Sequence, residues 1–291
     1  MRRWGFTTAF LATIVLAFAA SATAQLDDDM ADDEYEAIGS DVCEDCHEAS
    51  PHGSKYGEDL THSVHSELEC LDCHVSKGTV PHRGEEEEFF VGCQGCRTCH
   101  DEASEQYQGH GRAAIGACED MPHCSDCHGD HDILPSSVKR SKTHPLNLPE
   151  TCGKCHQDLN LTKKYDILVD NALEIYSISV HGRATRGGVY VAATCNDCHS
   201  ANGTAHRVLS PGHPDSSINH FNIPNTCGTC HKAIASDFWE GTHGKLVSRG
   251  ETDAPVCTHC HGEHGILSPS DPLSPVSRSK VAEQTLSLIH I

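Results

Sequence analysis

Hydrophobic residues are sparse along this chain and seldom follow a regular period. One stretch is an exception, because apolar side chains recur in it at steps of three and four residues, the spacing of one helix face: they are Tyr165, Leu168, Val169, Ala172, Leu173, Tyr176 and Val180. The pattern predicts an amphipathic helix that delivers His181 at its carboxyl end, where Gly182 can terminate it. We expect shorter helices over residues 101–108 and 233–240 to deliver His110 and His243 in the same way.

Elsewhere Pro and Gly interrupt most segments. Only 37% of the residues are hydrophobic, even with 18 cysteines counted among them. This is too little to build an ordinary core for a chain of 291 residues. The predicted fold is therefore mostly irregular, with short α-helices and little or no β-sheet.

Most of the cysteines fall into eight Cys-x-x-Cys pairs, and a histidine directly follows each pair. The cysteines are Cys43, Cys46, Cys70, Cys73, Cys96, Cys99, Cys124, Cys127, Cys152, Cys155, Cys195, Cys198, Cys227, Cys230, Cys257 and Cys260; the histidines are His47, His74, His100, His128, His156, His199, His231 and His261. Two such thiols can form thioethers with both vinyl groups of one haem, and the adjoining imidazole can then bind the iron as its proximal ligand. We predict eight c-type haems, closely packed in a chain, with the polypeptide wrapped around them.

Zinc is the main alternative, because structural zinc sites also use Cys-x-x-Cys pairs. Zinc sites do not require histidine directly after every second cysteine, and histidine makes up only about a twelfth of this chain. A thioredoxin-like dithiol would occur once, within a βαβ pattern that is not visible here. The repeated motif therefore favours haem over both.

The amino terminus has the pattern of a secretory signal peptide over residues 1–24. Two arginines precede an apolar run that is too short to span a bilayer comfortably, and an Ala-x-Ala site precedes Gln25. An uncleaved signal anchor is the alternative. Export fits haem attachment, which takes place outside the cytoplasmic membrane, so we predict a periplasmic or extracellular protein.

The chain is strongly acidic, since 42 Asp and Glu residues against 21 Lys and Arg residues give a formal charge of −21. Loss of the signal peptide removes two arginines and makes the chain more acidic. Such a protein should repel nucleic acid and favour redox partners with basic docking surfaces. We interpret residues 25–41 as an acidic, flexible leader.

A longer repeat connects the motifs within residues 42–285. In three units a His-Gly pair lies 14 residues before a motif and a further histidine follows that motif; in the first two of these units a second motif comes next. A looser first copy precedes them, so the units cover about 65–100, 110–156, 181–231 and 243–285. In the last unit Thr285 holds the place of the threonine before Cys152 and Cys227, which predicts a ninth motif at residue 286.

The chain instead ends with Leu286-Ser-Leu-Ile-His-Ile291. This hexapeptide matches the in-frame translation of a transposase end used in sequencing libraries. We interpret residues 286–291 as an adapter artefact, with a genuine short tail as the alternative, and do not treat His290 as a ligand. The natural protein is then expected to continue and to bind a ninth haem.

Each iron needs a second axial ligand or an open site, and methionine is nearly excluded because the mature chain holds only Met30 and Met121. Histidines at matching repeat positions are the favoured distal ligands: His65, His82, His110, His131, His181, His206, His243 and His264, with His52 or His62 for the first haem. Bis-histidine ligation predicts low-potential electron transfer without catalytic residues. The remaining histidines, including His123, His144, His213, His220 and His259, are expected at the surface or beside propionates.

Two cysteines lie outside the motifs, Cys93 and Cys118. In an oxidising compartment, a disulfide between them is the simplest expectation. A sulfur-reactive or iron-ligating thiol is the alternative.

Together, His-Gly, Cys-x-x-Cys-His-Gly-x-His and Thr-Cys-Gly-x-Cys-His resemble the doubled-motif multihaem c-type cytochromes, a cytochrome c3-like group. The resemblance covers nearly all of residues 43–285 and is strongest after His110. It implies a periplasmic or extracellular relay of closely packed bis-histidine haems, in anaerobic or metal-reducing respiration. The loose first unit and the longer interval from His199 to His206 depart from the pattern.

The leading interpretation is an electron carrier rather than an enzyme, which passes electrons from a quinol-oxidising membrane partner to a terminal acceptor, with a metal or mineral among the candidates. One alternative is the haem arm of a membrane quinone oxidoreductase whose b-type domain follows residue 285. Another is a multihaem reductase of nitrite, hydroxylamine or a sulfur oxyanion, although no Cys-x-x-Cys-Lys motif occurs. Self-assembly into a haem filament is a further alternative.

Overall fold

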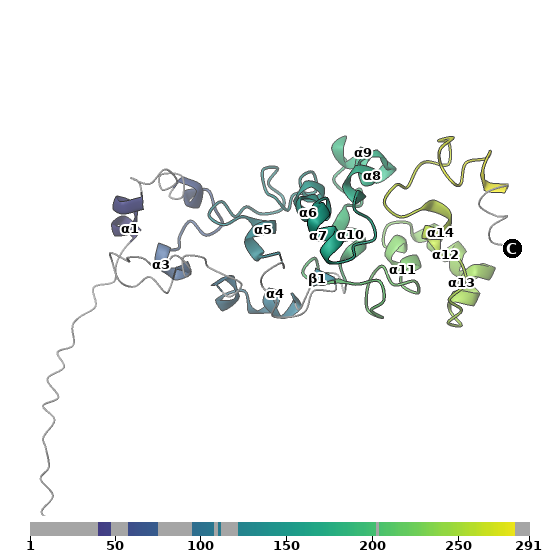
Figure 1. Cartoon of the computed structure of the whole chain (residues 1–291), viewed down its shortest axis with the longest axis horizontal. Helices are drawn as coiled ribbons and strands as arrows, with labels where there is room; N and C mark the ends of the chain where they lie inside the picture. Colours follow the sequence, from purple (N-terminus) through teal and green to yellow (C-terminus); the bar gives the residue numbers. More distant parts are fainter. Residues whose placement is uncertain are drawn as a thin grey trace, which may run out of the picture. The chain divides into compact units, whose positions relative to one another are not determined.

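The computed structural model describes residues 40–47, 58–74, 95–107, 110–111, 122–201 and 204–282, all within the unit Ile38–Ile291 (Figure 1). In these residues short helices alternate with turns, and the strands are two residues long. The predicted mostly irregular fold with short helices and little sheet is confirmed. The signal peptide, most of the leader, His52, His82, Cys93, Cys118 and residues 286–291 lie outside the described residues.

Most of the Cys-x-x-Cys-His motifs lie at the beginning or the end of a helix. The helices that begin at a motif are α3 (Cys70–Cys73), α5 (Cys124–His128), α10 (Cys195–His199) and α14 (Cys257–His261). Those that carry a motif at their carboxyl end are α1 (Ser40–His47) and α6 (Leu148–His156), whereas α11 (Ile223–Gly228) ends one residue after the first cysteine of the seventh motif. The third motif lies at a 3-10 turn, η3 (Gly95–Thr98).

The helices that begin at a motif share one capping bond. The side chain of the residue directly before the second cysteine accepts a hydrogen bond from the backbone N–H of the residue that precedes the motif. Asp126 accepts from His123 at 2.6 Å, and Asp197 accepts from Thr194 at 2.7 Å. Asp72 does the same, and the Nδ1 atom of His259 replaces the carboxylate in α14 at 3.2 Å. This bond satisfies a backbone donor and fixes the turn that holds both cysteines.

Further helices connect the motifs. They are a single helical turn over residues 58–61 and the helices α4 (Asp101–Gln106), α7 (Leu159–Lys164), α8 (Ala172–Ile178), α9 (Val180–Arg186), α12 (Lys232–Glu240) and α13 (Thr242–Val247). The helices predicted over residues 101–108 and 233–240 are confirmed as α4 and α12. The long amphipathic helix is wrong as predicted, because residues 165–171 form the connection between α7 and α8, and the remaining residues are divided between α8 and α9.

The break before His181 has a local cause. Ser179 is extended, with φ −68° and ψ 165°, and its Oγ accepts a hydrogen bond from Gly182 N at 3.0 Å. Ser179 therefore caps a new helix, and His181 lies inside α9 rather than at the end of α8. Gly182 does not terminate a helix; it allows the carbonyl of Tyr176 to approach so closely that a Cβ atom would clash.

The expected helical delivery of His110 is also wrong, because α4 ends at Gln106 and His110 lies in a strand. Strand β1 (His110–Gly111) pairs in parallel with β2 (Val208–Leu209), with His110 opposite Val208. Since β2 begins two residues after His206, this small sheet joins the backbone segments that carry His110 and His206.

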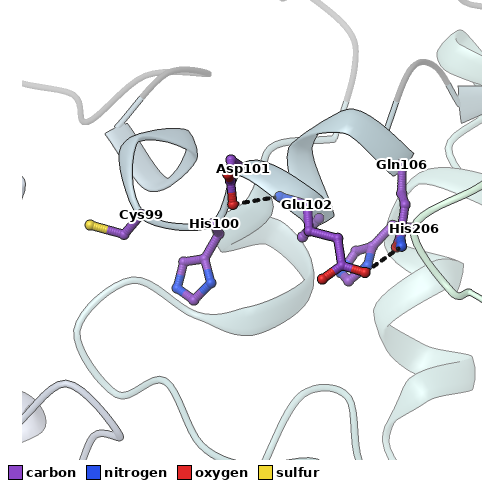
Figure 2. Close-up of a pocket in the computed structure, with 7 residues that line it drawn as sticks. Cys99, His100, Asp101, Glu102, Gln106 and His206 are labelled. Carbon is purple, nitrogen blue, oxygen red and sulfur yellow. Dashed lines mark hydrogen bonds between the residues drawn. The ribbon is translucent and has the colours of Figure 1, made fainter.

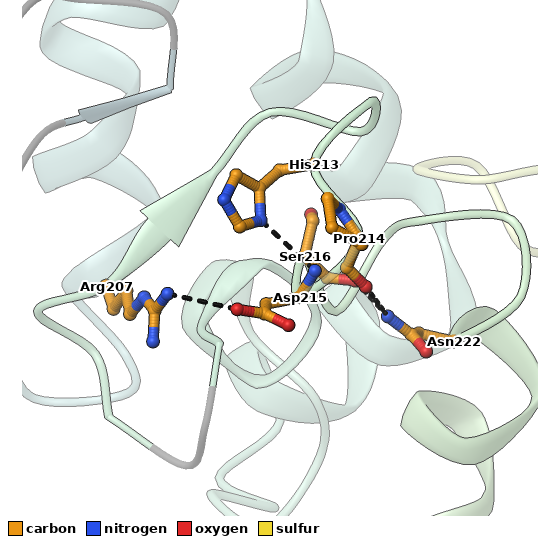
Figure 3. A network of polar contacts seen from close by, with 6 residues as sticks. All are labelled: Arg207, His213, Pro214, Asp215, Ser216 and Asn222. Atoms are coloured by element: carbon orange, nitrogen blue, oxygen red, sulfur yellow. Dashed lines mark hydrogen bonds and ion pairs between the residues drawn. The ribbon is translucent and has the colours of Figure 1, made fainter.

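Three copies of one loop recur between residues 134 and 281. A serine Oγ donates in each copy to a leucine carbonyl seven residues earlier: Ser141 to Leu134 at 3.0 Å, Ser216 to Leu209 at 3.1 Å, and Ser274 to Leu267 at 3.4 Å. Figure 3 shows the middle copy, where Asn222 donates to the carbonyls of Pro214 and Ser216 at 2.7 and 2.9 Å. Asn147 makes the matching bonds in the first copy, at the same distances. The sequence repeat is therefore also a structural repeat.

Buried apolar side chains are few in the described residues, and the cluster they form lies near the carboxyl end. Val247, Ala254 and Val256 are buried there, and partly buried Phe221, Ile223, Phe238, Trp239 and Leu246 pack against them. Among the residues described, no helix combines the length and apolar character needed to cross a membrane.

Candidate functional site

Six histidines of the Cys-x-x-Cys-His motifs each face a second histidine. In every pair the second histidine is one of those at matching repeat positions. The pairs and their ring-centroid distances are His65–His100, 5.9 Å; His74–His131, 6.2 Å; His110–His156, 6.0 Å; His128–His206, 6.0 Å; His181–His231, 6.2 Å; and His199–His264, 5.9 Å.

This spacing fits one metal ion between two imidazoles. A His nitrogen binds iron-sized metals at about 2.0 Å, and each coordinating nitrogen lies about 1.2 Å from its ring centre, so two coaxial ligands have centroids about 6.4 Å apart. Aromatic rings in offset or edge-to-face contact also have centroids about 4.5–7 Å apart, so the distance by itself does not exclude packing between the rings. The six separations are close to the width of axial ligation, and each joins a motif histidine to a histidine at a matching repeat position.

The pairs follow two rules along the chain. The His-Gly histidine of a unit faces the second motif of its own unit, as in His110–His156 and His181–His231. The histidine that follows the first motif faces the first motif of the preceding unit, as in His128–His206 and His199–His264. Histidine contacts therefore connect each unit both internally and to its neighbour.

The first unit follows the same two rules with less regular spacing. His65 faces His100 of its own second motif, and His131 of the next unit faces His74. Sequence intervals alone did not assign these partners, because the departures from the repeat lie in this part of the chain.

Within each motif, the helical turn places the reactive groups on one side. In α5, α10 and α14 the first cysteine, the second cysteine and the histidine occupy positions i, i+3 and i+4, which are neighbours on one helix face. This arrangement can present two thiols to adjacent vinyl groups while the imidazole approaches the ring centre. The donor set therefore fits haem c at these motifs.

Cysteines of successive motifs also lie beside one another. First cysteines of consecutive motifs are within hydrogen-bonding reach in three pairs: Cys96 with Cys124, Cys152 with Cys195, and Cys227 with Cys257. Second cysteines interact electrostatically in the three intervening pairs: Cys73 with Cys99, Cys127 with Cys155, and Cys198 with Cys230. Motifs two to eight therefore follow one another in space in their sequence order.

The amino-terminal motif adjoins the second one through its helix end. The backbone N–H of Ser40 in α1 donates to the Glu69 carboxylate at 3.1 Å, and Cys70 N donates to Ser40 Oγ at 3.0 Å. Hydrogen bonding to Ser40 lowers the pKa of Glu69. These contacts place the first two motifs side by side.

Burial keeps several of the paired imidazoles neutral. Burial, followed by the neighbouring His156, lowers the pKa of His110 to about 4, and burial together with nearby histidines, first His264, lowers that of His199 to about 4. The pKa values of His128, His156 and His181 are also lowered, mainly by burial. Neutral imidazole is the form that binds a metal ion, so these rings have the required protonation state at neutral pH.

A pocket lies between the third motif, helix α4 and His206 (Figure 2). Cys99 and His100 line it together with α4, and His206, the partner of His128, lines it as well. Gln106 Nε2 donates to Glu102 Oε1 at 3.5 Å along this wall. The pocket thus contains the motif histidine of one candidate site and the second histidine of the next.

Other histidines have different structural roles. His213 Nδ1 accepts from Asp215 N at 3.1 Å (Figure 3). His144 Nδ1 accepts from Leu146 N at the same distance, so both rings stabilise turns. The ring of His220 lies 5.7 Å from that of His259 at an interplanar angle of 82°, a contact that the sequence did not indicate. Neither ring belongs to a motif histidine, and His259 Nδ1 is bonded to the backbone of Val256.

Some histidines predicted to bind iron do not face a second histidine among the described residues. In the part of the chain that the structure describes, no second histidine ring faces His261 or His243. His62 Nδ1 lies 2.9 Å from the carbonyl oxygen of Glu58. His52 and His82 fall outside the described residues, so their expected ligation remains a prediction.

Comparison of the chain with protein-family models, curated proteins and solved structures gives no match.

Proposed function

We propose that the protein is an exported multihaem c-type cytochrome that carries electrons through a series of bis-histidine haems. The observation that carries the proposal is the set of six histidine pairs, each with a motif histidine on one side and ring centres 5.9–6.2 Å apart. Bound haem c supplies reversible one-electron chemistry.

The chain's own residues support this function in three ways. Cysteine pairs anchor each cofactor, paired imidazoles fill both axial positions, and cysteines of consecutive motifs lie near one another, which would bring neighbouring cofactors close together. Two histidine ligands leave no position on those irons for a substrate, which favours a carrier over a reductase at these six sites.

The scarcity of buried apolar side chains supports the same proposal. The buried hydrophobic residues that the structure describes are Leu134, Ala201, Val247, Ala254 and Val256. This number is too small for an ordinary core, whereas several porphyrins would add large apolar faces to the interior. The negative charge of the chain makes a basic surface the expected docking site on its redox partner.

Expression with a c-type haem maturation system tests the proposal. The pyridine haemochrome assay should give eight covalently bound haems per chain, and electron paramagnetic resonance should show low-spin ferric signals from the paired sites. Reduction should proceed at low potential because two imidazoles, rather than imidazole and methionine, bind each iron. Zinc in place of iron, or no covalent haem after maturation, would overturn the proposal.

A further inference from the structure

The loop that leads to His206 differs from the loops that lead to His131 and His264. His206 follows a motif histidine by seven residues, whereas the other two follow theirs by three. Two residues before His131 and His264 lies a glycine with a positive φ, of 95° and 77° respectively. The same position before His206 holds Thr204. Of these three second histidines, only His206 therefore has a hydroxyl group two residues before it.

The Thr204 hydroxyl lies beside the His206 ring. Its Oγ1 accepts a hydrogen bond from the backbone N–H of His206 at 3.2 Å and lies 3.5 Å from Nδ1 of the ring. The same hydroxyl donates to Oε1 of Gln106, the last residue of α4, at 2.7 Å. A hydroxyl has one proton to donate and two lone pairs, and the bond to Gln106 uses that proton. Thr204 can therefore only accept from Nδ1, so Nδ1 carries a proton.

This hydrogen-bond direction selects one tautomer of His206. With the proton on Nδ1, the lone pair of the neutral imidazole lies on Nε2, which is then the nitrogen that can bind a metal ion. The His206 ring faces that of His128, with centroids 6.0 Å apart. Thr204 therefore prepares the His206 ring to act as the second ligand of the fourth site.

The hydrogen bonds continue beyond Gln106. Its Nε2 donates to the carboxylate of Glu102 at 3.5 Å, and both side chains line the same pocket as His206 (Figure 2). Each bond in such a chain polarises the next, so the carboxylate strengthens the Thr204 hydroxyl as an acceptor. A stronger acceptor at Nδ1–H makes the imidazole more electron-rich and a better ligand for a cation. The chain therefore favours the oxidised state of a bound iron.

We propose that the Thr204 hydroxyl, held by Gln106, lowers the reduction potential of the haem that His206 ligates. Thr204 acts through His206 and is a positioning residue. On reduction the iron gains one electron and the proton stays on Nδ1, so the proposal requires no proton acceptor. This inference rests on the proposed function and deepens it, because it assigns one site of the relay its own means of setting the potential.

The fourth site lies within the series rather than at its end. Cys124 of the fourth motif is near Cys96 of the third, and Cys127 of the fourth is near Cys155 of the fifth. A lowered potential at this place makes electron transfer into the fourth site less favourable and transfer out of it more favourable. Thr204 would thereby control passage between the first unit and the rest of the relay.

Thr204→Val removes the hydroxyl and tests the proposal. In a redox titration of the haem-loaded protein, followed by electron paramagnetic resonance, the low-spin signal of one haem should be reduced at a higher potential. The haem count and the number of low-spin irons should not change. Thr204→Ser keeps the oxygen and should restore the original titration. Thr151→Val is the matched control, because it removes a hydroxyl that donates to the backbone carbonyl of Lys142 at 2.8 Å, and it should shift no potential.

Gln106→Leu provides a second test that leaves Thr204 in place. This change removes the acceptor that orients the hydroxyl, so it should raise the potential of the same haem by a smaller amount. Because Gln106 acts through Thr204, Gln106→Leu should add no further shift in the Thr204→Val protein.

Three results would overturn the inference. They are an unchanged titration in Thr204→Val, an equal rise in Thr204→Ser, and a new high-spin iron in Thr204→Val, which would show that the hydroxyl only holds the ring in place. If Thr204→Val does not mature, an unchanged titration in Gln106→Leu overturns the inference instead. Absence of covalent haem from the unsubstituted protein would contradict the proposed function itself, so the haem count distinguishes the two failures.

Discussion

The region over residues 58–107 and the region over residues 122–282 hold their histidine pairs in different surroundings. The second region contains three copies of the serine-bonded loop and the apolar cluster around Val256. Within the described residues, the first region has neither feature, and its helices are four to six residues long. Ring separations are nevertheless the same, 5.9 Å for His65–His100 and for His199–His264.

The difference shows that ligand spacing does not depend on conventional packing. Side-chain burial and loop hydrogen bonds position the histidines in the second region, whereas little protein structure supports them in the first. If haem binds between the paired histidines, the first region depends on its cofactors for stability more strongly than the second. The free energy of haem binding would stabilise the first region, which has no apolar cluster of its own among the described residues.

Loss of a cofactor should have the largest effect in the first region. Cys70→Ala with Cys73→Ala should bring amide hydrogen exchange over residues 58–74 close to unfolded rates. The matched change, Cys257→Ala with Cys260→Ala, should leave slow exchange at Val247, which retains its apolar neighbours. Equal loss of protection in both variants would contradict the comparison.

Acid should open sites in the second region over a defined pH range. His110 and His199 have folded pKa values of about 4, below the ordinary value of 6.5, so their stabilising contribution is complete above about pH 6.5 and is lost as the pH falls towards 4. Each accounts for about 3 kcal/mol over that range. A pH titration of the unfolding free energy of the haem-free protein, in which neither ring is bound to iron, should show this loss, and His110→Ala should reduce it.

Removal of His131, which faces a motif histidine of the first region, should weaken one of the contacts between the two regions. His131→Ala should convert one low-spin iron, that of the second motif, into a high-spin iron and lower the protection of residues 58–74. His264→Ala should produce the same single high-spin iron without affecting that segment, because its partner is His199. Resonance Raman spin markers and hydrogen exchange distinguish the two variants.

Close backbone approach predicts a smaller effect within the second region. Gly244→Ala should destabilise the protein by about 1–3 kcal/mol, since a Cβ atom there meets the carbonyl of Phe238 and the backbone of Trp239. Gly212→Ala is the control, with nothing within 4 Å of the added carbon. Denaturant unfolding midpoints should fall only for Gly244→Ala, and a similar fall for both would show that the contact is unimportant.

The smallest effect is expected at His213. Asparagine can accept the same bond from Asp215 N that His213 Nδ1 accepts, so His213→Asn should change neither the haem spectrum nor the stability by more than about 0.5 kcal/mol. A new high-spin signal in this variant would show that His213 ligates iron and that the turn-stabilising role is wrong.

The sequence predicted the local features of this molecule better than its long-range contacts. Cys-x-x-Cys-His and short helices such as α12 depend on neighbouring residues, and the structure contains those helices where they were expected. The pairing of His131 with His74 could not be predicted, because it joins residues 57 positions apart through the packing of two units. The helix break at Ser179 was missed because apolar periodicity continues through a residue whose hydroxyl favours a new N-cap.

The central claim is that each of the six histidine pairs holds one iron atom. An anomalous difference map at the iron absorption edge, from crystals of the haem-loaded protein, tests it directly. We expect an iron peak between the two rings of every pair, including His74–His131 and His199–His264. Iron peaks elsewhere, or rings of one pair bound to different irons, would contradict it.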